Sequence, residues 1–380
     1  MYGPCISMSV SRLEAFRSCA FKHFARYGLR LDAERGPRPL RLDLGSLAHE
    51  ILAEVTRRAM SMPGGVRGLS DEHWQALVAV ARAAAQRRLP PHVAKGRPDL
   101  VFQSERLGAF LEEVVLAQAE RWRRGVFEPV CCERGFGPAE AQQGWPPLEL
   151  LAPDGTRVWL WGRIDRLDRG RRGSRTFTLV YDYKSSTSGL NAAYLTGDRL
   201  QLFAYLLAAQ QVGAGQVGAE VGGALLIPLY PDVSALDKRY AQGADDATQR
   251  MYAYRPQGLF TDEVAPLLDE QLGTTASPVA RMRLKKDGGF DSGQSRDVVA
   301  APELQRRLEL ARHTILRAAA GITRGEVVAA PLVEGNCLAC RRCDFRPVCR
   351  FDRALNRPRT PAAVAPGLED IPAAATGDET

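Results

Sequence analysis

The sequence predicts a mixed α/β fold in which helices flank a small central sheet. Two observations along the 380 residues support this expectation. Apolar residues recur at helical spacing through the first part of the chain, and from Val126 the spacing becomes that of extended strands. A helix and one short, wholly apolar strand then follow, and this order of elements is typical of a layered α/β domain.

The first third of the chain is predicted to be helical. Ser11 and Glu14 have the form of a capping box at the start of the first helix, which continues to Gly28. The glycine-rich segment MPGGVRG breaks the chain after the second helix. The later helices are expected over residues 45–60, 71–88 and 104–124.

The middle of the chain carries the predicted sheet. The segment LELLAPDGTRVWLWGRIDRLD is typical of a hairpin whose turn is Pro153-Asp154-Gly155. The segment TFTLVYDYKSS is a third strand. Helical spacing returns over 198–211, and GGALLIPLY is a short strand of the buried kind.

We expect one folded domain over 1–355, followed by a disordered Pro- and Ala-rich tail over 356–380. The polar stretch 231–300 is interpreted as an insertion with one helix over 259–273. The other expected parts are a helical insertion at about 56–125, a core at about 126–230, a long helix at about 302–325 and a cysteine segment over 337–352.

The composition is typical of a soluble globular protein, with 45% hydrophobic and 25% charged residues. No run of roughly eighteen apolar residues is present to span a membrane. The opening MYGPCISMSVSRLE lacks the basic region and apolar core of a signal peptide. We therefore expect a cytoplasmic protein.

The net charge of +7 suits a polyanionic partner such as nucleic acid. The alternative is a general bias toward arginine, since only six of the 51 basic residues are lysines. Charge alone therefore favours a nucleic-acid partner only slightly.

Two carboxylates and a lysine form a candidate catalytic group. Asp182 and Lys184 lie two residues apart on the predicted third strand, so their side chains share one face of the sheet. Asp165, on the preceding strand, can lie beside Asp182 if the two strands pair in register. Two close carboxylates repel, and a divalent cation such as Mg²⁺ relieves that repulsion. A lysine beside the ion can stabilise the reacting phosphate or orient the attacking water.

Each of these features alone has an ordinary explanation. The pattern Asp-x-Lys occurs by chance in many proteins, usually on the solvated surface. His49 follows Gly45 by one helical turn and can supply a third metal ligand, but a capped or surface histidine is the alternative. Gln201 and Tyr205 share one helix face. A glutamine there can hold the lysine or a phosphate, and a tyrosine can stack on a base.

The eight cysteines predict a metal site near the C-terminal end of the sequence. Cysteines of a cytoplasmic protein rarely form disulfides. Four thiols cluster within GNCLACRRCDFRPVCRFD and could close a tetrahedral zinc site: Cys337, Cys340, Cys343 and Cys349. Three others are expected to be plain thiols: Cys5, Cys131 and Cys132.

Taken in order, these motifs resemble the RecB-like branch of the PD-(D/E)XK nucleases. They are Gly45-x-x-x-His49, Gly162-x-Ile164-Asp165, Asp182-Tyr183-Lys184 and Gln201-x-x-x-Tyr205. The segment SVSRLEAFRSCAFKHFARYGLRL, the RPQGLF segment and the cysteines resemble more closely the C-terminal nuclease domain of AddB proteins. AddB is one component of the bacterial AddAB helicase–nuclease, which processes double-strand breaks. The resemblance runs from about Tyr2 to Asp352.

The resemblance implies a restriction-endonuclease-like core and a specific chemistry. The groups that would hold Mg²⁺ or Mn²⁺ are His49, Asp165, Asp182 and a backbone carbonyl near Tyr183. Lys184 would position or activate water for phosphodiester hydrolysis that leaves a 5′-phosphate. Gln201 and Tyr205 would support the site and the DNA strand. Glu133 lies where similar proteins often carry an acidic residue.

The AddB pattern also implies a [4Fe–4S] cluster. Its four thiolates would be Cys19, Cys340, Cys343 and Cys349. Such a cluster would staple the two ends of the domain together, and by analogy with a disulfide it could constrain the unfolded chain by on the order of 5 kcal/mol. Zinc held by the four C-terminal cysteines is the alternative. We favour iron–sulfur because Cys19 lies in the segment that resembles AddB.

Two classes of function follow from the sequence. The first is a metal-dependent DNA exonuclease that acts in double-strand-break repair and recombination, with an AddA-like helicase–nuclease as candidate partner. The second is a catalytically silent DNA-binding module with a structural iron–sulfur or zinc site. The intact carboxylates and lysine favour the enzyme. AddB proteins are much longer and have an N-terminal helicase-like region outside this resemblance, so a stand-alone nuclease, a fragment and a split gene are the alternatives.

Overall fold

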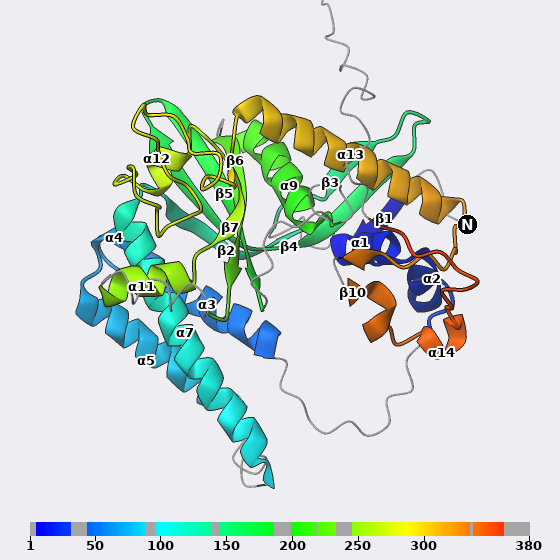
Figure 1. The fold of residues 1–380 in the computed structure, drawn as a ribbon, viewed down its shortest axis with the longest axis horizontal. Coiled ribbons are helices and arrows are strands. Elements are labelled where there is room, and N and C mark those ends of the chain that lie inside the picture. The colour runs from blue at the N-terminus through cyan, green and yellow to red at the C-terminus, as the bar shows by residue number, and fades with distance from the viewer. Residues whose placement is uncertain are drawn as a thin grey trace, which may run out of the picture.

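The computed structural model describes residues 5–31, 44–87, 96–138, 144–185, 199–216, 219–232, 245–334 and 337–360. Within these residues a mixed sheet of eight strands lies between two groups of helices (Figure 1). The predicted mixed α/β fold is therefore confirmed.

The sheet is built around the long antiparallel pair β4 (Arg157–Arg172) and β5 (Arg175–Lys184). The predicted hairpin is confirmed, because β3 (Leu148–Leu151) pairs antiparallel with β4 and Gly155 in the turn has a φ of 80°. The predicted apolar strand is β6 (Ala219–Pro228), which runs parallel to β5. The remaining strands of the sheet are β1 (Cys5–Ser9), β2 (Glu128–Phe136), β7 (Gln257–Thr261) and β8 (Val298–Val299).

Two hydrophobic cores cover the two faces of the sheet. On one face lie α3 (Leu44–Ser61), α5 (Asp71–Arg87) and α7 (Pro98–Arg124), which pack against Tyr181 and Tyr183 of β5. On the other face lie α1 (Val10–Ser18), α9 (Gln201–Gln216) and α13 (Ala301–Thr323), which pack against Val180. Because side chains alternate along a strand, Asp182 and Lys184 face α9.

The remaining short elements complete these layers. They are α2 (Ala20–His23), the π-helix η1 (Phe24–Gly28), α4 (Gly65–Gly68), α11 (Asp246–Ala253), α12 (Ala265–Leu268), β9 (Val333–Glu334), β10 (Cys337–Leu338), the 3-10 helix η2 (Ala339–Arg342) and α14 (Arg346–Cys349). None of the described helices is long and apolar enough to cross a membrane.

The first helix differs from the prediction. Its N-cap is Ser9, whose hydroxyl accepts a hydrogen bond from the Arg12 backbone N–H at 3.1 Å, so the capping box of Ser11 and Glu14 is wrong. The helix also does not continue to Gly28. It ends before Cys19, whose extended backbone separates α1 from α2.

The predicted helix over 259–273 is also wrong. Residues up to Thr261 form β7, which pairs antiparallel with β6, and α12 covers only four residues. Gly258 explains the pairing, since a Cβ there would lie 2.1 Å from the Ala224 carbonyl oxygen. The close approach of two strands therefore overrides the helical spacing of the segment.

The two ends of the domain lie side by side, where α1 and α2 meet α14 (Figure 1). The Leu332 N–H donates to the Ser18 carbonyl at 2.8 Å, and the Phe21 N–H donates to the Val328 carbonyl at 3.3 Å. Arg359 forms a β-bridge with Leu332, so the chain is still paired at that point. The remainder of the expected tail, 361–380, lies outside the described residues.

Candidate functional site

The register of two strands brings the candidate carboxylates together. In the antiparallel pair, Arg166 of β4 faces Tyr181 of β5, so Asp165 and Asp182 are the next residues opposite each other. Both are buried, with exposed fractions of 7% for Asp165 and 1% for Asp182. Burial and the charge of Asp165 raise the pKa of Asp182 to about 6, against the opposing charge of Lys184. Such a pair favours a bound cation.

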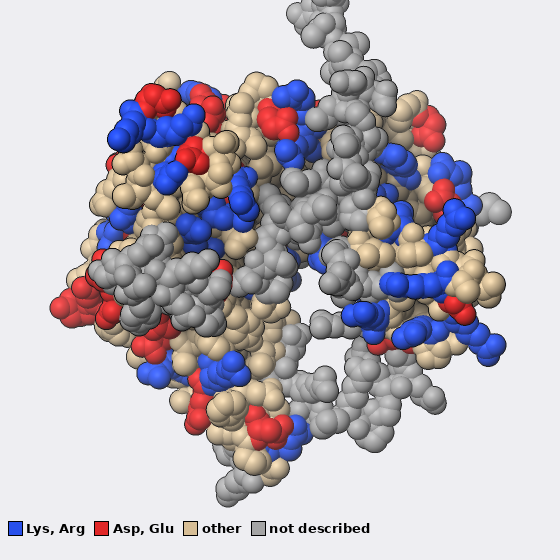
Figure 2. All heavy atoms as spheres, in the orientation of Figure 1, with Lys and Arg blue, Asp and Glu red and all other residues tan. Residues whose placement is uncertain are grey.

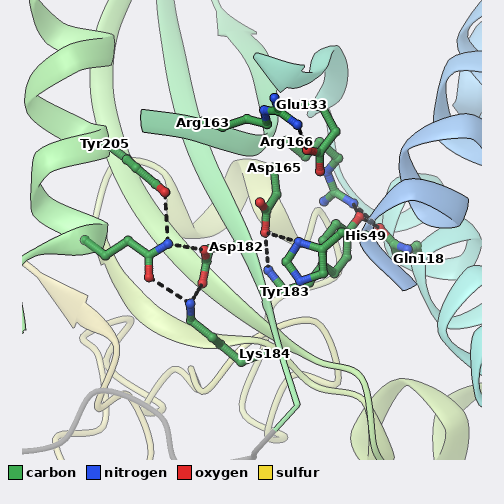
Figure 3. A network of polar contacts seen from close by, with 11 residues as sticks. His49, Gln118, Glu133, Arg163, Asp165, Arg166, Asp182, Tyr183, Lys184 and Tyr205 are labelled. Atoms are coloured by element: carbon green, nitrogen blue, oxygen red, sulfur yellow. Dashed lines mark hydrogen bonds and ion pairs between the residues drawn. The ribbon is translucent and has the colours of Figure 1, made fainter. Parts of the chain in front are cut away.

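His49 of α3 contacts the carboxylate of Asp165. Its Nδ1 lies 3.2 Å from Asp165 Oδ2, and the Tyr183 backbone N–H donates to the same oxygen at 2.8 Å (Figure 3). Burial lowers the pKa of His49, but the hydrogen bond and charge of Asp165, with the charges of Asp182 and Glu133, outweigh it and raise the pKa above its usual value. The imidazole therefore lies in a strongly negative environment.

Glu133 of β2 completes a group of possible metal ligands. One ligand atom from each of His49, Glu133 and Asp165 can be chosen so that all lie within 4.8 Å of one another. Glu133 Oε1 is buried without a hydrogen-bond partner among the described residues. Burial and the charge of Asp165 raise the pKa of Glu133. An orphaned carboxylate oxygen beside a second carboxylate and an imidazole fits a divalent cation.

Lys184 of β5 and Gln201 of α9 both contact Asp182. Lys184 Nζ lies 2.6 Å from Asp182 Oδ2 and donates to Gln201 Oε1 at 2.9 Å. The Gln201 amide donates to Asp182 Oδ1 at 3.2 Å and to the Tyr205 hydroxyl at 2.9 Å. Asp182 is therefore engaged by the lysine and the glutamine, while Asp165 is engaged by the histidine.

A buried arginine network behind the site was missed by sequence reasoning. Arg166 donates to Asp168 Oδ1 at 2.8 Å and to the Tyr183 hydroxyl at 3.2 Å, and it also contacts Gln118. Burial disfavours its charge, but Asp168 and the nearby tyrosines raise the pKa of Arg166 overall. The alternation of charged residues in RIDRLD was the available signal. The network anchors Tyr183, whose backbone N–H orients Asp165.

Four cysteines line one small cavity where the ends of the domain meet. They are Cys19, Cys340, Cys343 and Cys349. Burial raises the pKa of the Cys349 thiol, and the other three cysteines of this set raise it further. The side chain of Cys337 lies outside the described residues. Cys132 lies on β2, outside this set, and burial raises the pKa of its thiol to about 12.

Comparison with known proteins identifies the family. The family model of the PD-(D/E)XK nuclease superfamily matches residues 7–350. The chain belongs to the PD-(D/E)XK nuclease superfamily. Among curated proteins, this nuclease is similar to proteins that are each named as a subunit of an ATP-dependent helicase/deoxyribonuclease. The one from Desulforudis audaxviator is 34% identical over 97% of this chain and 32% of its own length.

Two further relatives of the nuclease carry the same name. The protein from Symbiobacterium thermophilum is 33% identical, and that from Moorella thermoacetica is 32% identical. Each alignment covers 93% of this chain and 30% of the relative. The chain therefore spans about a third of the length of the curated relatives that it matches.

Glu14 holds helix α9 in place. Its Oε1 accepts hydrogen bonds from the Leu200 N–H at 2.8 Å and the Gln201 N–H at 2.9 Å, across 186 and 187 residues of sequence. These are N–H groups at the start of α9, which have no acceptor within their own helix. Glu14 therefore caps α9 and fixes Gln201, which in turn contacts Lys184 and Asp182.

Replacing Glu14 by alanine should reduce stability by about 1 kcal/mol through loss of the cap. It should also lower kcat by roughly tenfold, because Gln201 then no longer fixes Lys184. Glu14→Gln keeps an oxygen acceptor and should restore most of the rate. The measurements are thermal unfolding and cleavage kinetics, with exposed Glu105→Ala as the matched control. Loss of stability with unchanged kcat in Glu14→Ala would contradict the positioning role.

Proposed function

We propose that this nuclease hydrolyses phosphodiester bonds in DNA with Mg²⁺ or Mn²⁺ as its catalytic ion. The observation that carries the proposal is the convergence of His49, Glu133 and Asp165 beside the Asp182–Lys184 pair. A divalent ion held there would polarise the phosphate and lower the pKa of a bound water. The proposed ligands are His49, Glu133, Asp165, Asp182 and the backbone carbonyl of Tyr183.

The protein side chains would divide the remaining work. Lys184 is held by Gln201 at 2.9 Å, which suits it to stabilise negative charge on the reacting phosphate or to orient the attacking water. The Tyr183 N–H fixes Asp165, and Tyr205 supports Gln201 through its hydroxyl. We propose that hydrolysis leaves a 5′-phosphate.

The proposed substrate is DNA, cleaved from an end. The relatives are named as deoxyribonuclease subunits, which supports DNA as the substrate class. Lys and Arg side chains also gather over the lobe formed by α1, α2 and α14 (Figure 2). Among the exposed ones are Arg26, Arg341, Arg346, Arg350 and Arg353. A basic surface of this kind favours binding to the phosphate backbone.

We further propose a helicase partner and a role in double-strand-break repair. The name of the relatives describes one subunit of a larger ATP-dependent helicase/deoxyribonuclease. An AddA-like helicase–nuclease is therefore the proposed partner of this chain.

A [4Fe–4S] cluster is proposed at the cysteine cavity. The support is that Cys19, Cys340, Cys343 and Cys349 line one cavity although the first lies more than 300 residues before the others. Thiolates are the usual ligands of both iron–sulfur clusters and structural zinc. Zinc held with Cys337 in place of Cys19 is the alternative that experiment must distinguish.

Metal removal tests the proposed activity. The full chain should degrade end-labelled linear DNA in Mg²⁺ or Mn²⁺, stop in EDTA and recover when excess Mg²⁺ is added, since the carboxylates bind the ion reversibly. Asp165→Asn should weaken Mn²⁺ binding measured by calorimetry in the absence of DNA. Covalently closed circular DNA is the control and should remain intact.

Each failure has a distinct meaning. Cleavage of closed circles as fast as linear DNA would show an endonuclease instead of an exonuclease. Binding of DNA without cleavage in either metal would support the catalytically silent module.

A further inference from the structure

A hollow of about 520 Å³ opens where the start of α1 meets β2 and β4. The proposed hydrolysis uses none of its space. Its volume lies within the range of sites that hold small organic groups. The chemistry of its walls indicates what it can hold.

Three aromatic residues line this hollow, together with Val10 and Pro138. Trp161 of β4 is 45% exposed, although large aromatic side chains are usually buried. Phe136 and Tyr205 line the same hollow and are buried, with their rings edge to face and their centroids 5.9 Å apart. An exposed indole in the same hollow as two packed rings is suited to stacking a flat ring.

Gly162 allows the rings to lie against the strand. A Cβ at this position would lie 3.1 Å from the Phe136 ring and 3.2 Å from the Tyr205 ring. Any side chain there would push against the aromatic wall. The absence of a side chain at Gly162 therefore leaves room for these two rings.

Two residues that line the hollow also contact members of the proposed catalytic group. Arg163 lines it and places its Nη1 3.6 Å from Glu133 Oε2. Tyr205 lines it and accepts a hydrogen bond at 2.9 Å from Gln201, which contacts Asp182. A group in the hollow would therefore adjoin the cleavage site, with the exposed guanidinium of Arg163 available for a phosphate.

We propose that this hollow holds one unpaired nucleobase of the strand being cleaved, stacked on Trp161, with a neighbouring phosphate against Arg163. The inference rests on the proposed DNA nuclease function and deepens it. A base must leave its duplex partner to enter, so the catalytic centre accepts a single strand. An exposed tryptophan also suits a protein partner. The hollow, however, adjoins Glu133 through Arg163 and Gln201 through Tyr205, and this favours the substrate strand.

Binding without cleavage tests this inference. The full chain is titrated in EDTA with fluorescein-labelled oligothymidylate, and anisotropy reports the Kd. Trp161→Ala should weaken binding by about tenfold, the usual effect of losing one stacked base, and Trp161→Phe should bind as the wild type does. Phe102→Ala is the matched control, since Phe102 is a 62% exposed aromatic on α7, outside this hollow. A blunt duplex of the same length should bind more weakly.

A series of oligonucleotides, each with one abasic position, makes the test independent of any folding defect. In the wild type, one abasic position should weaken binding by about tenfold, and Trp161→Ala should be insensitive at that position. Equal binding of wild type and Trp161→Ala, or identical abasic profiles, would overturn the proposal. A Trp161→Ala variant that binds DNA as the wild type does, but no longer binds a protein partner, would also overturn the proposal. If binding depends on one abasic position but the chain never cleaves DNA, the nuclease activity is rejected and the base site stands.

Discussion

Replacement of Lys184 by alanine should lower the rate of phosphodiester hydrolysis by on the order of 10²- to 10³-fold. Lys184 is a cation placed by two contacts, at 2.6 Å from Asp182 and 2.9 Å from Gln201. Removing it leaves charge on the reacting phosphate without this stabilisation. Single-turnover cleavage of end-labelled linear DNA in Mg²⁺ measures the effect on the chemical step.

Two controls separate chemistry from structure. Lys184→Gln keeps a hydrogen-bond donor for Asp182 but no charge, and it should be nearly as slow as Lys184→Ala. Lys286→Ala removes an exposed lysine and should leave the rate unchanged. Mn²⁺ binding should survive in Lys184→Ala, because His49, Glu133 and Asp165 are untouched. A rate for Lys184→Ala within a few-fold of the wild type would remove this residue from the mechanism.

Replacement of Cys19 by alanine should abolish the proposed metal cluster and destabilise the domain by up to about 5 kcal/mol, the scale of closing a very long loop. Cys19 lies between α1 and α2, whereas its expected partners follow more than 300 residues later. Iron and sulfide content, visible absorption and thermal unfolding measure the outcome. The purified wild type should be brown.

The paired variant Cys337→Ala distinguishes the two metal assignments. An iron–sulfur cluster on Cys19 should survive in Cys337→Ala, whereas zinc on the four C-terminal cysteines should be lost. Cys5→Ala, which changes a thiol outside the cavity, should resemble the wild type in metal content. A colourless protein that binds zinc, and loses it only in Cys337→Ala, would support the zinc site.

The strand that carries Asp182 could be predicted because its pattern is local. Residues Tyr181 to Lys184 alternate between the two faces of the sheet, and pairing in register then places Asp165 opposite Asp182. The position of Glu133 could not be derived in this way. Its φ of 52° and the shift of register between Pro129 and Cys131 depend on how β2 pairs with β4.

The errors share a physical cause. Ser11 and Glu14 match a local cap, but the carboxylate of Glu14 accepts instead from the N–H groups of Leu200 and Gln201. The segment over 259–273 has helical spacing, yet pairing with β6 makes its beginning a strand. A contact between residues distant in sequence leaves no periodic trace, so the spacing of apolar residues cannot reveal it.

The pairing of Ser18 with Leu332 bears on the order of assembly during translation. A chain leaves the ribosome N-terminus first, at about 5–20 residues per second, so Ser18 must wait for more than three hundred later residues before Leu332 exists. Until then the β4–β5 hairpin can form, but α1, whose Glu14 caps α9, lacks the segment around Leu332 that pairs with Ser18. A ribosome stalled before Leu332 would therefore hold a nascent chain with every proposed ligand of the catalytic ion already made and its supporting lobe still incomplete.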